Sequence, residues 1–239
     1  MSYGRIGVIG AMDSELAALI AELAQPARET VQGLAFHTGR LGAREVVLVR
    51  CGIGKVSAAR CTQVLIDRFA PAAVINTGIA GGLGAGLAVG DIVVADGLVQ
   101  HDFDAAPIGF VRGCLCMGDP GAPTVFTPDE PLSALLARTA GDAAGAQRVH
   151  RGLIATGDQF ISGAAAKAAI RSAFPSAMAA EMEGGAVAQA ASMSGVPFAV
   201  VRAISDLADG TAAASFEQFE QHAADVSAAA VLQALALLD

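Results

Sequence analysis

The stretch Phe198-Ala-Val-Val-Arg-Ala-Ile-Ser-Asp206 decides the fold class of this 239-residue chain. It begins with a continuous apolar run, Phe198-Ala-Val-Val201, which does not alternate between apolar and polar positions. Such runs are typical of strands that are buried on both faces, as in sheets covered by helices on both sides. The polar pair Ser205-Asp206 directly follows the predicted strand, 198–204, and lies at its carboxyl end.

Apolar runs of the same kind alternate with segments of helical pattern along most of the chain. We predict further strands over residues 5–10, 34–39, 45–51, 73–77, 91–99, 150–156 and 177–182. We predict helices over residues 13–24, 55–69, 129–140, 164–174 and 185–194. Pro26 is expected to end the first helix, Leu41-Gly-Ala43 to turn a hairpin, and a glycine-rich loop to follow residue 77.

The last predicted helix has an apolar stripe with spacings of three and four residues. The stripe consists of Phe216, Phe219, Ala223, Val226 and Ala230. This amphipathic pattern predicts a helix that closes over the core.

These elements predict an α/β fold, with a mixed, mostly parallel central sheet flanked by helices on both faces. The length allows one domain over residues 1–239, because a chain of this size can bury a single large core. Residues 105–128, rich in Gly and Pro, are predicted to form a loop at the rim of a site rather than a domain linker.

Composition excludes several classes of partner. The net charge is −8 and the only lysines are Lys55 and Lys167, so nucleic acid and anionic membrane surfaces are not expected partners. The sequence has no run of eighteen consecutive apolar residues, so a membrane span is not expected. The N-terminal segment lacks the features of a signal peptide. Four cysteines are too few for a disulfide framework, which favours a reducing, cytoplasmic location.

Polar residues and glycines follow several of the predicted strands. Ligands of α/β sheets bind beyond the carboxyl ends of the strands, so these segments are candidates for one site. Taken singly, Glu15 could favour a helix dipole and Asp206 could cap a helix. Taken together, Glu15, Glu183 and Asp206 at three strand ends predict a functional site.

Common cofactor motifs are absent. Val49 and Val56 replace the first glycine and the Ser/Thr of a phosphate-binding P-loop around Gly52–Lys55. Residues 78–86 lack the spacing of a dinucleotide-binding loop, and the four histidines lack metal-ligand spacing. Cys114-Leu-Cys116 has no second pair of ligands nearby, so these thiols are interpreted as incidental. No metal and no organic cofactor are therefore expected.

Nine sequence blocks, spread in order over nearly the whole chain, point to one family. The blocks are IGAMDSE at 9–15, CGIGKV at 51–56, INTGIAGG at 75–82, VGDIVV at 89–94, HDFD at 101–104, RGLI at 151–154, GDQFI at 157–161, EME at 181–183 and VRAISD at 201–206. In these blocks the chain resembles the bacterial 5′-methylthioadenosine/S-adenosylhomocysteine nucleosidases of the purine nucleoside phosphorylase superfamily. The resemblance implies hydrolysis of the N-glycosidic bond of 5′-thio-substituted adenosines, and of 5′-deoxyadenosine, with release of adenine.

The resemblance also implies a role for each candidate polar residue. Asp206 matches the general acid that protonates adenine N7, which requires a raised pKa, and Ser205 is expected to orient it. Glu15 matches the residue that holds and deprotonates the attacking water, and Glu183 the acceptor of the ribose hydroxyls. Arg202 resembles a family arginine that lies near these acids; the alternative is an ordinary salt-bridge partner.

The remaining substrate contacts are implied in the same way. Met182 and Phe160 match side chains that pack on ribose and adenine, and Ile161 matches the position whose backbone reads the adenine edge. The other implied binding residues are Met12, Ile53, Ile79, Ala80, Gly81 and Phe216. The resemblance implies a small-molecule purine nucleoside as ligand and a homodimer in which the 105–115 loop reaches the neighbouring site.

Several departures from the family pattern bear on the 5′ substituent. Ile79 stands where serine is frequent, Gly184-Gly185 replaces an Ala-Thr pair, and residues 107–110 and 114–123 differ from the usual loop. A futalosine-type nucleosidase, a phosphate-dependent phosphorylase and a binding module without catalysis are the alternatives. Asp13 and Glu15, with no Arg or Lys in the first loop, favour water over phosphate. The presence of all three carboxylates argues against the binding module.

Overall fold

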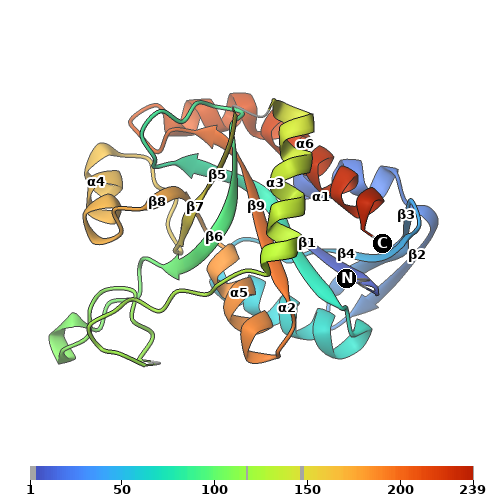
Figure 1. Ribbon diagram of the computed structural model, residues 1–239, viewed down its shortest axis with the longest axis horizontal. Helices are drawn as coiled ribbons and strands as arrows, with labels where there is room; N and C mark the ends of the chain where they lie inside the picture. The colour runs from blue at the N-terminus through green and yellow to red at the C-terminus, as the bar shows by residue number, and fades with distance from the viewer. Residues whose placement is uncertain (1–3, 117, 146–147, 239) are drawn as a thin grey trace.

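A nine-stranded mixed sheet organises the computed structural model, which describes residues 4–116, 118–145 and 148–238 (Figure 1). Its strands are β1 Ile6–Gly10, β2 Ala24–Val31, β3 Leu34–Leu41, β4 Arg44–Arg50, β5 Ala73–Gly82, β6 Ile92–Gln100, β7 Val149–Thr156, β8 Ala177–Glu181 and β9 Phe198–Asp206. The helices are α1 Asp13–Ala21, α2 Lys55–Phe69, α3 Glu130–Ala144, α4 Ala164–Ala173, α5 Gly184–Met193 and α6 Ala212–Leu237, with a short 3₁₀ helix, η1, at Ala106–Ile108.

The sheet closes on itself over part of its width. The strand order is β2-β3-β4-β1-β5-β8-β7-β6-β9, and β9 also pairs with β5. Strands β5, β8, β7, β6 and β9 therefore form a closed ring, while β1 to β4 extend from β5 as an open wing. The pairs β1–β4, β1–β5, β5–β9, β6–β7 and β7–β8 are parallel, and the hairpins of the wing are antiparallel. The predicted mixed sheet is confirmed, whereas its closure was not predicted.

Helices cover both faces of the sheet, as predicted (Figure 1). Helices α2 and α5 pack together on one face, and α1, α3 and α6 pack on the other. The predicted stripe of α6 faces inward, since Ala223 and Ala230 are fully buried and Phe216, Phe219 and Val226 are partly buried. Burial of this apolar area is the main source of stability for such a layered fold.

Two predictions are wrong: the C-terminal end of the first helix and the end of the strand that begins at residue 73. Helix α1 ends at Ala21, and Pro26 lies inside an unpredicted strand, β2. This strand is at the edge of the sheet and mostly exposed, so it tolerates a residue without an N–H and shows no apolar run. Residues 78–82 continue strand β5 rather than forming a loop. A Cβ at Gly78 would collide with the Glu15 carboxylate, so glycine here permits a close approach.

The segment 101–128, which includes the loop predicted over residues 105–128, is irregular apart from η1 and a bridge between Leu98 and Phe126. Cys114 in this segment is buried and Cys116 exposed, and both thiols are free. Met117, in the divergent stretch 114–123, lies outside the described residues. Within the described ranges, no cluster of three or more His, Cys, Asp or Glu side chains could hold a metal ion. No helix in the described part of the chain has the length and apolar character needed to cross a membrane.

Candidate active site

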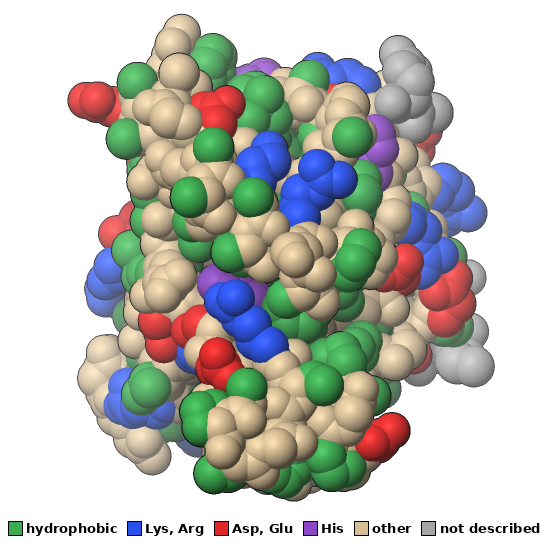
Figure 2. Space-filling view, turned by 90° about the vertical axis from the view of Figure 1, so that its left-hand side faces the viewer, with side chains coloured by type: hydrophobic (Ala, Val, Ile, Leu, Met, Phe, Trp, Pro, Cys, Tyr) green, Lys and Arg blue, Asp and Glu red, His purple; other side chains and the backbone are tan. Residues whose placement is uncertain are grey.

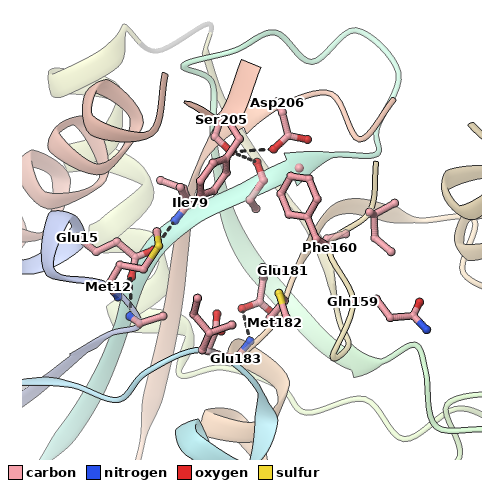
Figure 3. A pocket seen from close by; sticks show the side chains of 17 residues that line it. Met12, Glu15, Ile79, Gln159, Phe160, Glu181, Met182, Glu183, Ser205 and Asp206 are labelled. Atoms are coloured by element: carbon pink, nitrogen blue, oxygen red, sulfur yellow. Dashed lines mark hydrogen bonds between the residues drawn. The ribbon is translucent and has the colours of Figure 1, made fainter. Parts of the chain in front are cut away.

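A cavity lies where the carboxyl ends of β1, β5, β8 and β9 meet (Figure 3). It is lined by Ala11, Met12, Glu15, Ile53, Ile79, Ala80, Gly81, Gln159, Phe160, Ile161, Ala180, Glu181, Met182, Glu183, Ser205, Asp206 and Phe216. The structure thus brings every predicted site residue to one cavity except Arg202. Sequence reasoning missed Ala11, Gln159, Ala180 and Glu181. Ala11, Gln159 and Glu181 carried a usable signal, because each belongs to one of the nine family-like blocks, whereas Ala180 lies outside them.

Glu15 is held by backbone N–H groups at the start of α1. Its Oε2 accepts hydrogen bonds from Ala11 N at 2.5 Å and Met12 N at 3.0 Å, and its Oε1 accepts one from Ile79 N at 3.1 Å. Burial raises the pKa of Glu15, while the Arg202 charge and these hydrogen bonds oppose the rise. The result is a fixed carboxyl group with increased basicity, which suits a group that accepts a proton from water.

Glu181 and Arg202 form a buried ion pair, with 2.6 Å between Arg202 Nη2 and Glu181 Oε2. The same Nη2 donates to Asn76 Oδ1, also at 2.6 Å. Burial alone would raise the pKa of Glu181, but the Arg202 charge and several hydrogen bonds hold it below the usual value. Arg202 does not line the cavity, so a direct substrate contact is not supported. Its guanidinium instead neutralises a carboxylate that does line the cavity.

Glu183 lies two residues beyond Glu181, at the start of α5. Its Oε1 accepts a hydrogen bond from Gly54 N at 2.8 Å. Burial and the neighbouring Glu181 charge raise the pKa of Glu183, and Arg202 counteracts them only in part. Two carboxyl groups beside one arginine thus differ in protonation behaviour, because Arg202 bonds only one of them directly.

Hydrogen bonds between three distant segments hold the loop that carries Gly54. Lys55 N donates to Asp158 Oδ1 at 2.8 Å, and Lys55 Nζ donates to Asp102 Oδ1 at 2.6 Å. Asp158 N donates to Asp102 Oδ2 at 2.9 Å and completes the network. Gly54 has φ +94°, and a Cβ there would meet Asp158 Oδ1 at 3.0 Å, so the loop requires glycine at this position.

Asp206 ends strand β9 with both carboxylate oxygens engaged. Its Oδ1 accepts from Ala208 N at 2.8 Å, and its Oδ2 accepts from Ser205 Oγ at 2.9 Å. Burial raises the pKa of Asp206 and the Asp209 charge adds to the rise, while the two hydrogen bonds oppose it. Ser205 Oγ also lies 3.4 Å from Ala80 O. When Asp206 is protonated, the Ser205 hydroxyl can donate to that carbonyl and accept a hydrogen bond from the O–H of the Asp206 carboxyl.

Apolar side chains line the cavity together with the acidic groups. Phe160 and Phe216 meet edge to face, with 5.6 Å between ring centroids and an interplanar angle of 88°. Figure 3 shows Glu15 at the left of the view and Asp206 near the top, with Phe160 below Asp206 and Met182 lower still, above Glu183. Such a pocket accommodates a flat, largely apolar ligand whose polar atoms meet the carboxyl groups.

Comparison with known proteins adds an independent line of evidence. The profile of the "Phosphorylase superfamily" matches residues 5–236. A 5′-methylthioadenosine/S-adenosylhomocysteine nucleosidase from Actinobacillus succinogenes is 42% identical over 235 residues, covering 98% of this chain and 100% of the relative.

Two solved structures illustrate the range of similar folds. The S. pneumoniae 5′-methylthioadenosine/S-adenosylhomocysteine nucleosidase with the transition-state inhibitor MT-ImmA has a TM-score of 0.91 at 41% identity, covering 98% of this chain and all of that one. A futalosine hydrolase from Helicobacter pylori has a TM-score of 0.87 at 32% identity, covering 97% of each chain.

Proposed function

The chain belongs to the phosphorylase superfamily and, within it, to the 5′-methylthioadenosine/S-adenosylhomocysteine nucleosidases, and from this membership we propose its reaction and mechanism. The enzyme hydrolyses the N-glycosidic bond of methylthioadenosine and S-adenosylhomocysteine to adenine and the 5-thioribose product. The observation that best supports this function is the cavity, which Glu15, Glu183 and Asp206 line together with apolar side chains. One domain over residues 1–239 performs the reaction.

Asp206 acts as the general acid. Cleavage of the glycosidic bond drives electrons into the purine, which leaves more readily when N7 is protonated. An acid for this step must retain its proton near neutral pH, and burial raises the pKa of Asp206 in that direction. Ser205 orients the carboxyl group, since its hydroxyl bonds Asp206 Oδ2.

Glu15 and Glu183 act on the ribosyl side of the bond. Departure of the base leaves positive charge on the sugar ring, which nearby carboxylates stabilise. Glu15, fixed by three N–H donors, binds the attacking water and accepts its proton. Glu183, positioned by Gly54 N, accepts hydrogen bonds from the ribose hydroxyls.

Water rather than phosphate is the nucleophile. The described residues that line the cavity include four carboxyl groups, Glu15, Glu181, Glu183 and Asp206, and no Lys or Arg. A phosphate ion entering this cavity would meet carboxyl groups, while the nearby cation Arg202 is already paired with Glu181, and in a partly buried site such repulsion is strong. The lining therefore supports hydrolysis over phosphorolysis.

The enzyme acts as a homodimer through the face that surrounds the cavity mouth. Four exposed apolar side chains, Ile53, Val56, Ile108 and Phe160, define this rim face. The Lys55–Asp102–Asp158 network joins the segments that carry Ile53, Val56 and Phe160, and Ile108 lies in the segment that follows Asp102. Figure 2 views the side with α4 and the 101–128 segment, where hydrophobic side chains cover much of the lower half. Contiguous exposed apolar surface of this kind marks an interface.

The free thiols, three of them buried, support a reducing compartment, the cytoplasm. The 5′ substituent that the enzyme accepts depends on Ile79, which lines the cavity, and on the loop residues 107–110 and 114–123, which differ from the family pattern.

The deciding experiment is an incubation with methylthioadenosine, with and without phosphate, in which adenine and the sugar product are quantified. We expect adenine and free methylthioribose at a rate that phosphate does not change. A rate that depends on phosphate, with a ribose 1-phosphate product, would identify a phosphorylase. Turnover of futalosine but not of methylthioadenosine would assign the enzyme to the futalosine-type alternative.

A further inference from the structure

Lys167 connects two parts of the molecule on either side of the cavity. Its Nζ, on helix α4, donates to Gly82 O at 2.8 Å and to Leu207 O at 2.7 Å. Gly82 ends strand β5, and Leu207 directly follows Asp206 at the end of β9. Lys167 is partly buried and does not line the cavity, so any effect on the reaction must act through its neighbours.

The two connected parts each carry a wall of the cavity. Helix α4 follows the segment with Phe160 and Ile161, which line the cavity. The carbonyls that Lys167 binds belong to the strand ends that carry Gly81 and Asp206. One ammonium group therefore fixes the aromatic segment relative to the acid.

The backbone after Asp206 needs this support. Ala208 has φ +50°, a left-handed conformation that is uncommon for a residue with a Cβ. In this conformation Ala208 N donates to Asp206 Oδ1 at 2.8 Å. A strained backbone persists only when surrounding contacts hold it, and the Lys167 bond to Leu207 O is one such contact.

We propose that Lys167 is a positioning residue for the general acid: by binding Gly82 O and Leu207 O it holds the turn at Ala208 and, through it, the Asp206 carboxyl. This inference rests on the proposed function, in which Asp206 protonates the base. It assigns an influence on the reaction to a residue outside the nine family-like blocks.

Because charged groups surround Asp206, the effect of Lys167 can be measured in the pH profile of kcat. The charged groups that face Asp206 are Asp209, on the turn that follows β9, and Lys167, on α4; Arg171 on α4 faces Lys167. The Lys167 ammonium lowers the pKa of Asp206, against the effects of burial and Asp209. A general acid works only while protonated, so the alkaline limb of kcat follows its pKa. Removal of the ammonium should therefore move that limb to higher pH.

The test compares Lys167→Met and Lys167→Arg with Arg171→Met, a matched loss of charge one turn further along α4. We expect kcat at neutral pH to fall about tenfold or more in Lys167→Met, because misplacing a catalytic group by a fraction of an ångström is costly. Its alkaline limb should move to higher pH. Lys167→Arg should recover most of kcat and leave the limb in place, and Arg171→Met should match the wild type.

Further measurements separate positioning from loss of structure. Calorimetric titration with adenine gives the Kd of each variant without turnover, and thermal unfolding gives its Tm. Weaker adenine binding by Lys167→Met at nearly unchanged Tm supports the proposal. A wild-type kcat and pH profile in Lys167→Met overturns it, as does an equal loss of kcat and Tm in both Lys167 variants. Absence of turnover in the wild type would refute the proposed function, while adenine binding would still test the effect of Lys167 on the cavity.

Discussion

Arg202 Nη2 lies 2.6 Å from Glu181 Oε2, and both side chains are almost completely buried. This pair places a positive charge behind a cavity whose lining residues are acidic. The positive charge of Arg202 lowers the pKa of Glu15, Glu181 and Glu183. Arg202 therefore affects all three carboxyl groups without lining the cavity.

Removal of the arginine should destabilise the fold. In Arg202→Met, Glu181 remains buried without its cation, and such a change costs about 3–5 kcal/mol of the free energy of unfolding. Urea denaturation of both proteins at pH 7 measures the loss. Arg151→Met, which breaks the exposed pair with Glu130, is the control and should leave stability nearly unchanged. Equal stability of Arg202→Met and the wild type would contradict the role of Arg202 as a buried counter-ion.

Replacement of the acid should separate chemistry from binding. Asp206→Asn keeps the shape of the side chain but has no carboxyl proton to give, so kcat should fall about 10²- to 10⁴-fold. Adenine should still bind, which calorimetry can measure. Asp225→Asn, exposed on α6 and bonded to Gln221, is the control and should retain the activity of the wild type. Near-normal turnover of Asp206→Asn would exclude this residue as the general acid.

Replacement of Glu15, the group that accepts the proton from water, should affect the acid limb of the pH profile of kcat. Glu15 must be ionised to accept a proton from water, and burial raises its pKa, so kcat should fall as the pH drops through that value. Glu15→Gln should bind methylthioadenosine but turn it over about 10²- to 10⁴-fold more slowly. Stopped-flow or steady-state assays from pH 5 to pH 9 test both statements. An acid limb that persists unchanged in a still active Glu15→Gln would assign the limb to another group.

Glu183 should make the protein less stable as the pH rises. Its folded-state pKa is raised, so between the ordinary glutamate pKa and the folded value the native state binds more protons than the unfolded state. Stability then decreases with increasing pH across that window. Glu183→Gln removes the titration, so its stability relative to the wild type should increase from pH 5 to pH 8. Glu217→Gln, exposed on α6, is the control for urea unfolding at both pH values. A constant difference would show that Glu183 titrates alike in both states.

The homodimer should depend on the rim face. Val56 is 81% exposed, and a charge there would be buried without a partner in a dimer through this face. Val56→Glu should therefore sediment as a monomer at concentrations where the wild type is a dimer. Leu237→Glu, an exposed position at the end of α6, should remain dimeric, because the C-terminal end of the chain lies across the molecule from α4 in Figure 1. A monomeric wild type, or a dimer in Val56→Glu, would reject this interface.

The sequence was most informative where local pattern and chemistry coincide. Helix α2 begins at Lys55 and ends at Phe69 as predicted, because its amphipathic pattern is bounded by glycines before it and by Pro71 after it. Glu15, Glu183 and Asp206 were found because they lie near the ends of predicted strands, which meet at a common edge of the sheet. The other predicted cavity residues were implied by the family resemblance.

Other features depend on tertiary context and left no local signal. Strand β2 is exposed and contains a proline, so its pattern resembles a loop. Ring closure between β5 and β9 joins residues more than a hundred positions apart, which periodicity does not encode. The place of Arg202 depends on Glu181 and Asn76, two partners that only folding brings to it.

The closed ring of strands also determines when, during synthesis, the chain can complete its fold and its active site. Both neighbours of β9, strands β5 and β6, emerge from the ribosome long before it, and until it arrives each has an unpaired edge. Exposed edges of this kind favour association between chains. The same late strand delivers Asp206, so a nascent chain gains its protected barrel and its acid together, and a product truncated before β9 has neither.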